Sequence, residues 1–245
     1  MKHQLSDGIL EIANKVAKIK GVKSLLKPIY YPYKRYLESR RNNSFLKNGK
    51  NVLQQFDKAM NEGGYFYTLA FGTMLGAVRE HGFIKHDLDI DVYMWSEDWS
   101  TKLQTHLKKY GFELLHCFLV DEGALGREET YIKDNVTIDI FYLYPPIDKY
   151  PYCCDFLMYP GTATFRQSIS EHGGLIPRRI ELPISKNRTN IQFEGMSLFI
   201  PKNYDEILSF RYGPDYMIPN PNWSFKSDNN HVTVWSDKIG GLSNA

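Results

Sequence analysis

Three aspartates alternate with apolar residues in the segment Asp87-Leu-Asp-Ile-Asp91. In a β-strand, side chains two residues apart point to the same face, so the three carboxylates would share one face. Like charges in a row repel one another, and aspartate is depleted in strands, so such a row indicates a bound cation. Carboxylate oxygens are hard ligands that suit Mg²⁺ or Mn²⁺ rather than zinc. The segment therefore predicts a divalent-metal site, the alternative being the solvated face of an edge strand.

The pair Gly72-Thr73 lies shortly before these aspartates, between a predicted strand and a predicted helix. A glycine allows the backbone to approach a ligand closely, and the free N–H groups at a helix N-terminus attract anions. Junctions of this kind are also common as simple turns. Next to a metal-binding strand, we interpret Gly72-Thr73 as the place where a phosphate binds.

A further acid, Asp139, stands inside the apolar segment Val136–Tyr144. Burial of an unpaired carboxylate costs free energy, so Asp139 should face a metal ion or a hydrogen-bonding partner. The alternative is a structural aspartate that caps a neighbouring loop. A Gly-Ser/Thr turn, an Asp-x-Asp strand and a third aspartate on a later strand occur here in the order that is typical of nucleotidyltransferases.

These groups must be positioned by both helices and strands. The spacing of apolar residues predicts helices at 9–30 (ended by Pro28), 49–61, Met74–Glu80, 97–110 and 204–211. Strands are predicted at Tyr65–Phe71, within Ile84–Trp95, and at Phe112–Val120, Glu129–Lys133, Val136–Tyr144, Ile191–Phe193 and Ser197–Ile200. The segment 145–180 and the tail from Pro219 show no regular pattern, and the length of 145–180 suggests acceptor binding. The pattern predicts an α+β fold: a mixed sheet flanked by helices, with an N-terminal helical extension.

The composition limits the classes of function. With 245 residues, 42% of them apolar and 24% charged, the chain is long enough for one globular domain with an appendage. A net charge of +2 gives no argument for a nucleic-acid partner. Three cysteines without a C-x-x-C pair predict neither a disulfide framework nor a thiolate zinc site, which favours the cytoplasm. We find no apolar run of 18 residues and no signal peptide pattern, and so expect a soluble or peripheral protein.

The N-terminal part of the chain is strongly basic. Between Lys15 and Arg41 there are nine basic residues and one acid, with four tyrosines among them. Such a segment can lie against an anionic membrane, which would place the protein at the inner face of the membrane. The alternative is a solvated helix that packs on the main domain. We accordingly divide the chain into a basic helical extension, 1–48, and a catalytic domain, 49–245.

The segment FGTMLGAVREHGFIKHDLDIDVYM, residues 71–94, resembles the core of the LicD family, which includes bacterial phosphocholine transferases and is related to fukutin and fukutin-related protein. The family pattern is G-T/S-L-L-G-A-x-R, then G-F-I, then W-D-x-D-I-D. This chain departs from it at Met74 and His86, which leaves the acids unchanged. VTIDIFYLY (136–144) resembles the family strand with the third aspartate, and the segment from Ile200 to Trp223 resembles the C-terminal block, which a histidine usually follows, here His231. The similarity spans about residues 50–235.

The resemblance implies a nucleotidyltransferase-like fold and transfer of a substituted phosphate from a CDP-alcohol to a hydroxyl of a surface glycan or glycolipid, such as a lipopolysaccharide precursor, with release of CMP. It implies that Asp89, Asp91 and Asp139 are catalytic and hold Mg²⁺ or Mn²⁺. Asp139 is either a metal ligand or the base that accepts the hydroxyl proton. The donor would be bound by a wider set of residues: Gly72, Thr73, Arg79, Asp87, Arg211 and His231.

Several alternatives stay open at this stage. Arg79 and Arg211 each stand near a helix end, where arginine is also favoured by the helix dipole, and a lone histidine such as His231 is often only a surface residue. A nucleotidyltransferase that moves a nucleoside monophosphate and releases pyrophosphate would use the same acids. A non-catalytic scaffold is the third class. No motif identifies the transferred alcohol, the acceptor sugar or an oligomeric state.

Overall fold

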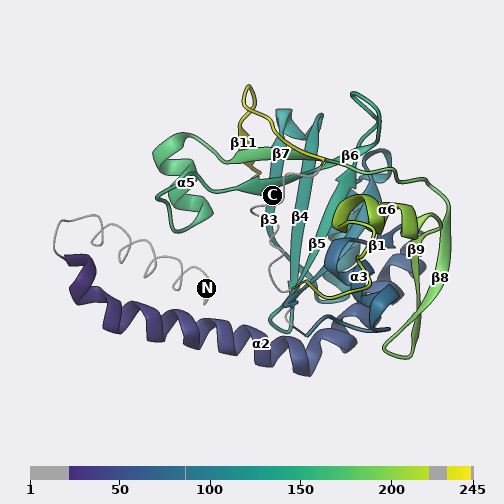
Figure 1. The fold of residues 1–245 in the computed structure, drawn as a ribbon, viewed down its shortest axis with the longest axis horizontal. Helices are drawn as coiled ribbons and strands as arrows, with labels where there is room; N and C mark the ends of the chain where they lie inside the picture. Colours follow the sequence, from purple (N-terminus) through teal and green to yellow (C-terminus); the bar gives the residue numbers. More distant parts are fainter. Residues whose placement is uncertain (1–21, 86, 221–230, 244–245) are drawn as a thin grey trace.

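The computed structural model describes residues 22–85, 87–220 and 231–243, and its elements surround one six-stranded sheet (Figure 1). Residues 9–21 of the first predicted helix, His86 and the end of the C-terminal block, residues 221–223, lie outside the described residues. The strand order is β1-β2-β5-β4-β3-β11, with β2 parallel to β5 and the other neighbours antiparallel. The strands are β1 (Thr68–Leu69), β2 (Asp89–Trp95), β3 (Glu113–Val120), β4 (Gly126–Lys133), β5 (Val136–Leu143) and β11 (Gly240–Leu242). The predicted α+β fold with a mixed sheet is confirmed.

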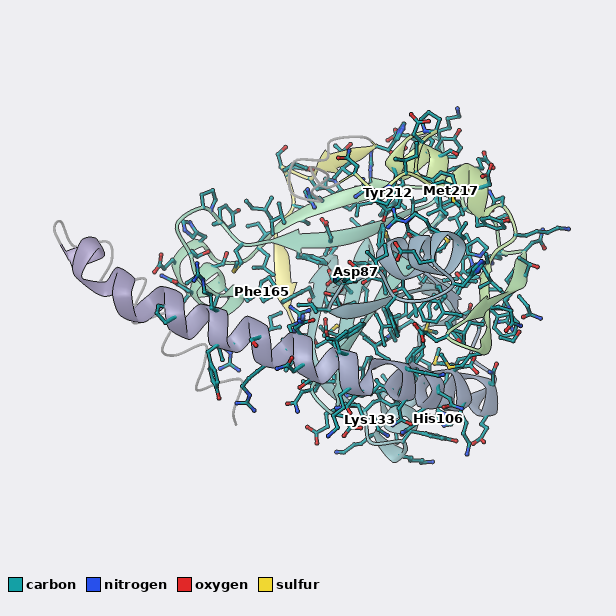
Figure 2. All side chains as sticks on the ribbon, turned by 60° about the horizontal axis from the view of Figure 1, so that its bottom comes forward. Asp87, His106, Lys133, Phe165, Tyr212 and Met217 are labelled. Atoms are coloured by element: carbon teal, nitrogen blue, oxygen red, sulfur yellow. The ribbon has the colours of Figure 1, made fainter. Side chains whose placement is uncertain are left out.

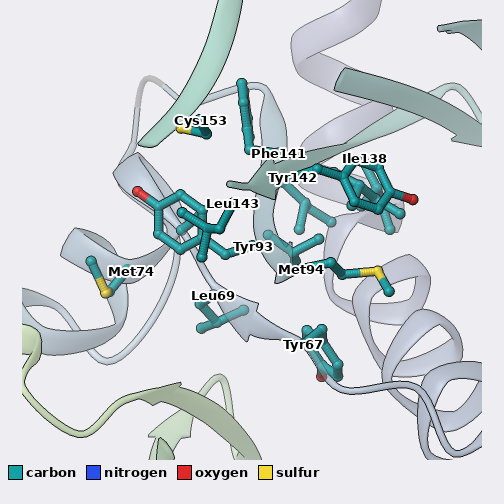
Figure 3. Close-up of a cluster of buried hydrophobic side chains, with 14 of the residues drawn as sticks. Tyr67, Leu69, Met74, Tyr93, Met94, Ile138, Phe141, Tyr142, Leu143 and Cys153 are labelled. Carbon is teal, nitrogen blue, oxygen red and sulfur yellow. The ribbon is translucent and has the colours of Figure 1, made fainter. Parts of the chain in front are cut away.

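Alternation along β2 and β5 assigns their side chains to two faces. Ile90, Val92 and Met94 are fully buried or nearly so, as their spacing predicts. Figure 3 shows Met94 and Ile138 on the side of the sheet that the long helix α2 (Val22–Gly63) covers, which we call the helical face. Tyr93 and Leu143 lie on the other side with Met74 and Cys153. The aspartates of β2 and β5 share the second face, because they stand two or four residues from Tyr93 and Leu143.

One long helix, α2 (Val22–Gly63), replaces the two helices predicted at 9–30 and 49–61 (Figure 1). The expectation that Pro28 ends a helix was wrong. A proline removes one N–H group and crowds the preceding turn, which bends some helices without ending them. The apolar stripe predicted for 49–61 is confirmed, because four of its side chains are fully buried against the sheet: Val52, Leu53, Phe56 and Met60.

The next helix, α3 (Phe71–Arg79), begins earlier than predicted, and β1 is only two residues long. Gly72-Thr73 therefore belongs to the first turn of α3 rather than to a loop before it. The glycines of the segment allow tight packing behind the helix: a Cβ at Gly76 would lie 2.5 Å from the carbonyl oxygen of Gly82. This close contact, together with the hydrogen bond from the N–H of Gly82 to the carbonyl of Gly76, holds the turn after α3 against the helix.

Helix α4 (Thr101–Lys109) lies within the predicted range 97–110. A short 3₁₀ turn, Ser96–Asp98, precedes it. It begins at Ser100, whose hydroxyl accepts a hydrogen bond from the N–H of Lys102. A tight hairpin joins β4 and β5, where Asp134 and Asn135 both have positive φ angles.

The segment 145–180 is not irregular, which corrects the sequence prediction. It forms β6 (Tyr152–Leu157), α5 (Phe165–His172) and the start of β7 (Ile176–Glu181), and β10 (Val232–Val234) completes a second sheet in the order β10-β7-β6. The tail was also wrongly predicted to lack strands, because β10 and β11 pair with distant parts of the chain. The partners of these short strands are non-local, so local periodicity does not reveal them.

The C-terminal hairpin and helix agree with the prediction. Strands β8 (Arg188–Phe193) and β9 (Met196–Pro201) are joined by Glu194-Gly195, and α6 (Tyr204–Tyr212) follows. No helix among the described residues is long and apolar enough to cross a membrane. The division at residue 48 stays a prediction, although α2 runs through it without a break.

A buried polar cluster stabilises the helical face of the sheet around Glu129. Its carboxylate accepts hydrogen bonds from the indole of Trp99 (3.0 Å), the guanidinium of Arg127 (2.9 Å), and the hydroxyls of Tyr131 (2.9 Å) and Tyr142 (3.0 Å). Glu129 is only 5% exposed and its bonds from Tyr131 and Tyr142 are buried, so water does not easily replace it as the acceptor for these two hydroxyls.

We therefore predict that Glu129→Ala lowers the free energy of unfolding by about 3 kcal/mol or more, because it leaves a buried arginine and two tyrosine hydroxyls without their acceptor. Urea denaturation measures the loss. The control is Glu113→Ala, the same change at an exposed site on β3. Equal stabilities of the two variants would contradict the role of the cluster.

Candidate functional site

Asp91 and Asp139 lie side by side on the parallel strands β2 and β5. Their Cα atoms are direct partners in the strand register. Adjacent strands are about 4.8 Å apart and partnered side chains share a face, so the two carboxylates are forced close together. The sequence predicted both acids, and the structure shows that they meet.

The N-terminal turn of α3 lies against the same strand. The hydroxyl of Thr73 accepts a hydrogen bond from the N–H of Asp91 at 2.9 Å, and the N–H of Ala70 donates to the Asp91 carbonyl. A Cβ on Gly72 would lie 2.5 Å from a carboxylate oxygen of Asp87. Gly72 therefore makes room for Asp87, which stands in the loop before β2 and not on the strand itself. Figure 2 shows Asp87 between α2 and Tyr212 in that view.

Asp89, the first residue of β2, is paired with a residue that the motifs did not select. Nη2 of Arg41, on α2, donates a hydrogen bond to Oδ2 of Asp89 at 2.9 Å. The sequence placed Arg41 only in the basic extension. Its role at the site could not be derived from spacing, because it depends on how α2 crosses the sheet.

The site holds more negative charge than the protein neutralises. Burial, followed by repulsion from Asp89, raises the pKa of Asp139 to about 7, against the hydrogen bond from Thr130 and the charge of Arg41. Burial and then repulsion from Asp89 and Asp139 raise the pKa of Asp91 well above its ordinary value. Burial and then repulsion from Asp89 raise the pKa of Asp87 to about 6, and the positive charge of Arg79 opposes this rise. Burial is the largest cause of each shift and repulsion between the carboxylates the second, and the positive charges of Arg41 and Arg79 only partly oppose them.

A row of polar side chains continues across the sheet from Asp139. The hydroxyl of Thr130, on β4, donates to Asp139 at 2.6 Å and lies 2.8 Å from Nε2 of His116, on β3. Glu128 stands two residues from Thr130 on the same face, and burial and then repulsion from Asp139 raise its pKa well above the ordinary value. The sequence prediction missed Glu128, because it began the strand at Glu129, and it missed His116, because nothing within its strand relates that residue to the acids. Glu128 becomes informative through the register of β4 with β5, and His116 through its pairing with Thr130 in the register of β3 with β4.

The other predicted donor-binding residues differ in their placement. Arg79 is largely buried beside Asp87, pairs with Glu80 and donates to the carbonyl of Tyr216 at 3.5 Å, so it is not a simple surface charge. Arg211 is 3% exposed, and its guanidinium lies 5.9 Å from the ring centre of Phe71 at the start of α3.

His231 occupies a different place from the arginines. Its ring stacks on Phe210 of α6, with the ring centroids 3.4 Å apart, and its carbonyl accepts from the N–H of Glu181. Among the described residues, no contact links His231 with the acids. The structure thus brings both arginines to α3 but does not bring His231 to the carboxylates.

The donor set fits a divalent cation in its chemistry. Partly buried carboxylates on β2 and β5 are hard oxygen ligands with too little positive charge around them. Within the described ranges, no three Asp, Glu, His or Cys side chains already point to one common position for a metal ion. Side-chain rotation, including release of Asp89 from Arg41, would be needed to form such a position.

Comparison with known proteins gives a family match over most of the site. The family model described as LicD/FKTN/FKRP, nucleotidyltransferase domain, matches residues 64–203. Two similar proteins are the ribitol-5-phosphate transferase FKTN of Macaca fascicularis, 26% identical over 183 residues, and that of Homo sapiens, 25% identical over 183 residues. Each alignment covers 75% of this chain and 36% of the relative, so the chain spans about a third of the length of these relatives.

The charge balance predicts a pH dependence of stability. A carboxyl whose pKa is raised on folding, as for Asp139, stabilises the fold fully below its unfolded pKa of about 4, and this stabilisation is lost as the pH rises through about 7. Asp139→Asn keeps an oxygen acceptor for Thr130 and removes the titration. In EDTA, the stability of the variant relative to the wild type should therefore increase between pH 5 and 7, by at most about 1.4 kcal/mol per pH unit.

Urea denaturation at several pH values measures this difference. Groups that do not interact with Asp139 cancel from it, whereas Asp91 and Glu128, whose pKa values Asp139 raises, add to the difference with the same sign. Asp237→Asn, the same change at an exposed turn, is the control. A difference that stays constant with pH for Asp139→Asn would contradict the proposed charge excess.

Proposed function

Because the chain belongs to the LicD/FKTN/FKRP nucleotidyltransferase family, we propose that it transfers a substituted phosphate from a CDP-alcohol donor to a hydroxyl group of a glycan, with Mg²⁺ or Mn²⁺, and releases CMP. The relatives named as ribitol-5-phosphate transferases support a phosphotransferase. They also favour this function over nucleotidyl transfer with release of pyrophosphate.

The observation that carries the proposal is the register pair Asp91–Asp139 beside the N-terminus of α3. Two acids on one face of the sheet suit a cation, and the adjacent helix N-terminus suits an anion. A metal-bound diphosphate satisfies both. The same arrangement would have no use for a neutral ligand.

Each part of the site has a chemical task in this reaction. A divalent cation bound by Asp89, Asp91 and Asp139 would offset the negative charge that develops on the leaving CMP. The free N–H groups of the first turn of α3, at Gly72 and Thr73, would bind donor phosphate oxygens. Arg79 and Arg211 would add positive charge near that turn, Arg79 beside Asp87 and Arg211 beside Phe71.

The acceptor hydroxyl must lose its proton during the transfer. Asp139 would accept it if a metal ion does not occupy both of its oxygens. Glu128, on the same face of β4, is a second group that could accept this proton. We propose these two as the candidate bases.

The transferred group is the finer part of the proposal. Ribitol phosphate is the first candidate because of the names of the relatives, and glycerol phosphate, phosphocholine and phosphoethanolamine are the others. We further propose a cytoplasmic location with peripheral contact at the inner membrane face, where a glycan or glycolipid acceptor would be met. The basic residues of the N-terminal extension support this.

The proposal predicts release of CMP when the protein is incubated with Mg²⁺, a glycan acceptor and one of CDP-ribitol, CDP-glycerol, CDP-choline or CDP-ethanolamine. Asp91→Asn should lower the rate at least about a hundredfold, as loss of a single group that stabilises transition-state charge typically does. Asp237→Asn should leave the rate unchanged. Chromatography of the nucleotide products measures the reaction.

Two results would contradict this function. Formation of pyrophosphate from CTP and a small acceptor, without CMP from any CDP-alcohol, would indicate a nucleotidyltransferase. Full activity in EDTA, or in Asp91→Asn, would refute the role of the metal ion.

A further inference from the structure

Arg41 supplies a positive charge among the acids from outside the region that matches the family model. The model covers residues 64–203, whereas Arg41 lies on α2. Its guanidinium donates to Asp89 at 2.9 Å and is close enough to Asp139 to lower the pKa of that carboxyl. Arg41 therefore lies where the proposed metal ion and donor phosphates would meet the protein.

The packing of α2 holds Arg41 in this place. Phe45, one helical turn after Arg41, is buried and contacts the ring of Phe83 edge to face, with centroids 4.8 Å apart. Residues four apart lie on the same side of a helix, so the side that packs on the domain also carries Arg41. Asn48 adds a hydrogen bond of 3.0 Å to the carbonyl of Asp134, in the turn before β5. The helix is thus joined to the loop before β2 and to the turn before β5.

The pair Arg41–Asp89 is suited to exchange of partners. Its side chains are 48% and 38% exposed, and ion pairs with this exposure add little to stability. A divalent cation that takes Asp89 would release the guanidinium. The planar guanidinium then matches the oxygens of a phosphate group, to which it can donate two parallel hydrogen bonds.

We propose that Arg41 binds the diphosphate of the donor nucleotide, and that it serves as the counter-ion of Asp89 until a divalent cation and the donor are bound. This inference rests on the proposed function, because it assumes a nucleotide donor. It assigns Arg41 a role different from that of the other basic residues of the extension. Arg40 is the natural contrast, since it is exposed and its guanidinium lies over the ring of Tyr36, 5.8 Å from the centroid.

The test compares Arg41→Gln and Arg41→Lys with the matched control Arg40→Gln, all in the full chain. Mn²⁺ binding without nucleotide is measured by electron paramagnetic resonance, and CDP binding in saturating Mn²⁺ by calorimetry. Arg41→Gln should bind Mn²⁺ several-fold more tightly, because the competing cation is lost, and should bind CDP about tenfold more weakly. Arg41→Lys should bind CDP with intermediate affinity. Arg40→Gln should match the wild type in both measurements, and all variants should unfold at the same temperature.

Each result has a defined meaning. If the wild type binds CDP and Arg41→Gln binds it as well as Arg40→Gln does, Arg41 is not a phosphate ligand, and the proposed function is unaffected. Unchanged or weaker Mn²⁺ binding by Arg41→Gln would refute the competition for Asp89. If the wild type does not bind CDP in the presence of Mn²⁺, the nucleotide donor itself is wrong, and the inference fails with it.

Discussion

The parallel pairing of β2 with β5 is the constraint on which the site depends. Because the register aligns Asp91 with Asp139, two carboxylates that are far apart in the sequence must share one small area of the sheet. Repulsion between them has to be offset nearby, and several neighbours serve this purpose. Thr130 donates a hydrogen bond to Asp139, and Arg41 contributes a positive charge. The remaining excess of negative charge is the physical reason to expect a cation.

The two faces of the sheet differ in how their acids are paired. On the face that α2 covers, α2 and buried strand residues form an apolar layer, and the buried acid Glu129 has four hydrogen-bond donors. On the other face, Asp91 and Glu128 remain short of positive charge. A protein can accept such poorly paired acids only if other parts of the fold stabilise it, and the helical face is the part that does.

The sequence predicted what depends on local spacing. Alternation predicted the faces of β2, helical spacing predicted the apolar stripe of α2, and the motif order predicted that Asp91 and Asp139 belong together. It did not predict what depends on long-range pairing. Strands β6 and β7 are joined through α5, the three-residue strands β10 and β11 pair with distant segments, and Glu128 comes close to Asp139 only through the register of β4 with β5. Pro28 misled the prediction because a single local signal was weighed above the continuation of the helix.

Helix α2 shows why a site of this kind extends beyond its motif. A motif specifies the acids but not the group that balances their charge while no ligand is bound, and that group can come from any element that reaches the sheet. Here α2 crosses the end of the sheet at which β2 and β5 begin, and it carries Arg41 one helical turn before the buried Phe45. The stripe that packs Phe45 against the domain therefore also sets the distance between the guanidinium and Asp89. A shift of α2 on the domain would move Arg41 and so change the charge balance of the site without substitution of an acid. The helical extension and the carboxylate cluster therefore form one physical unit.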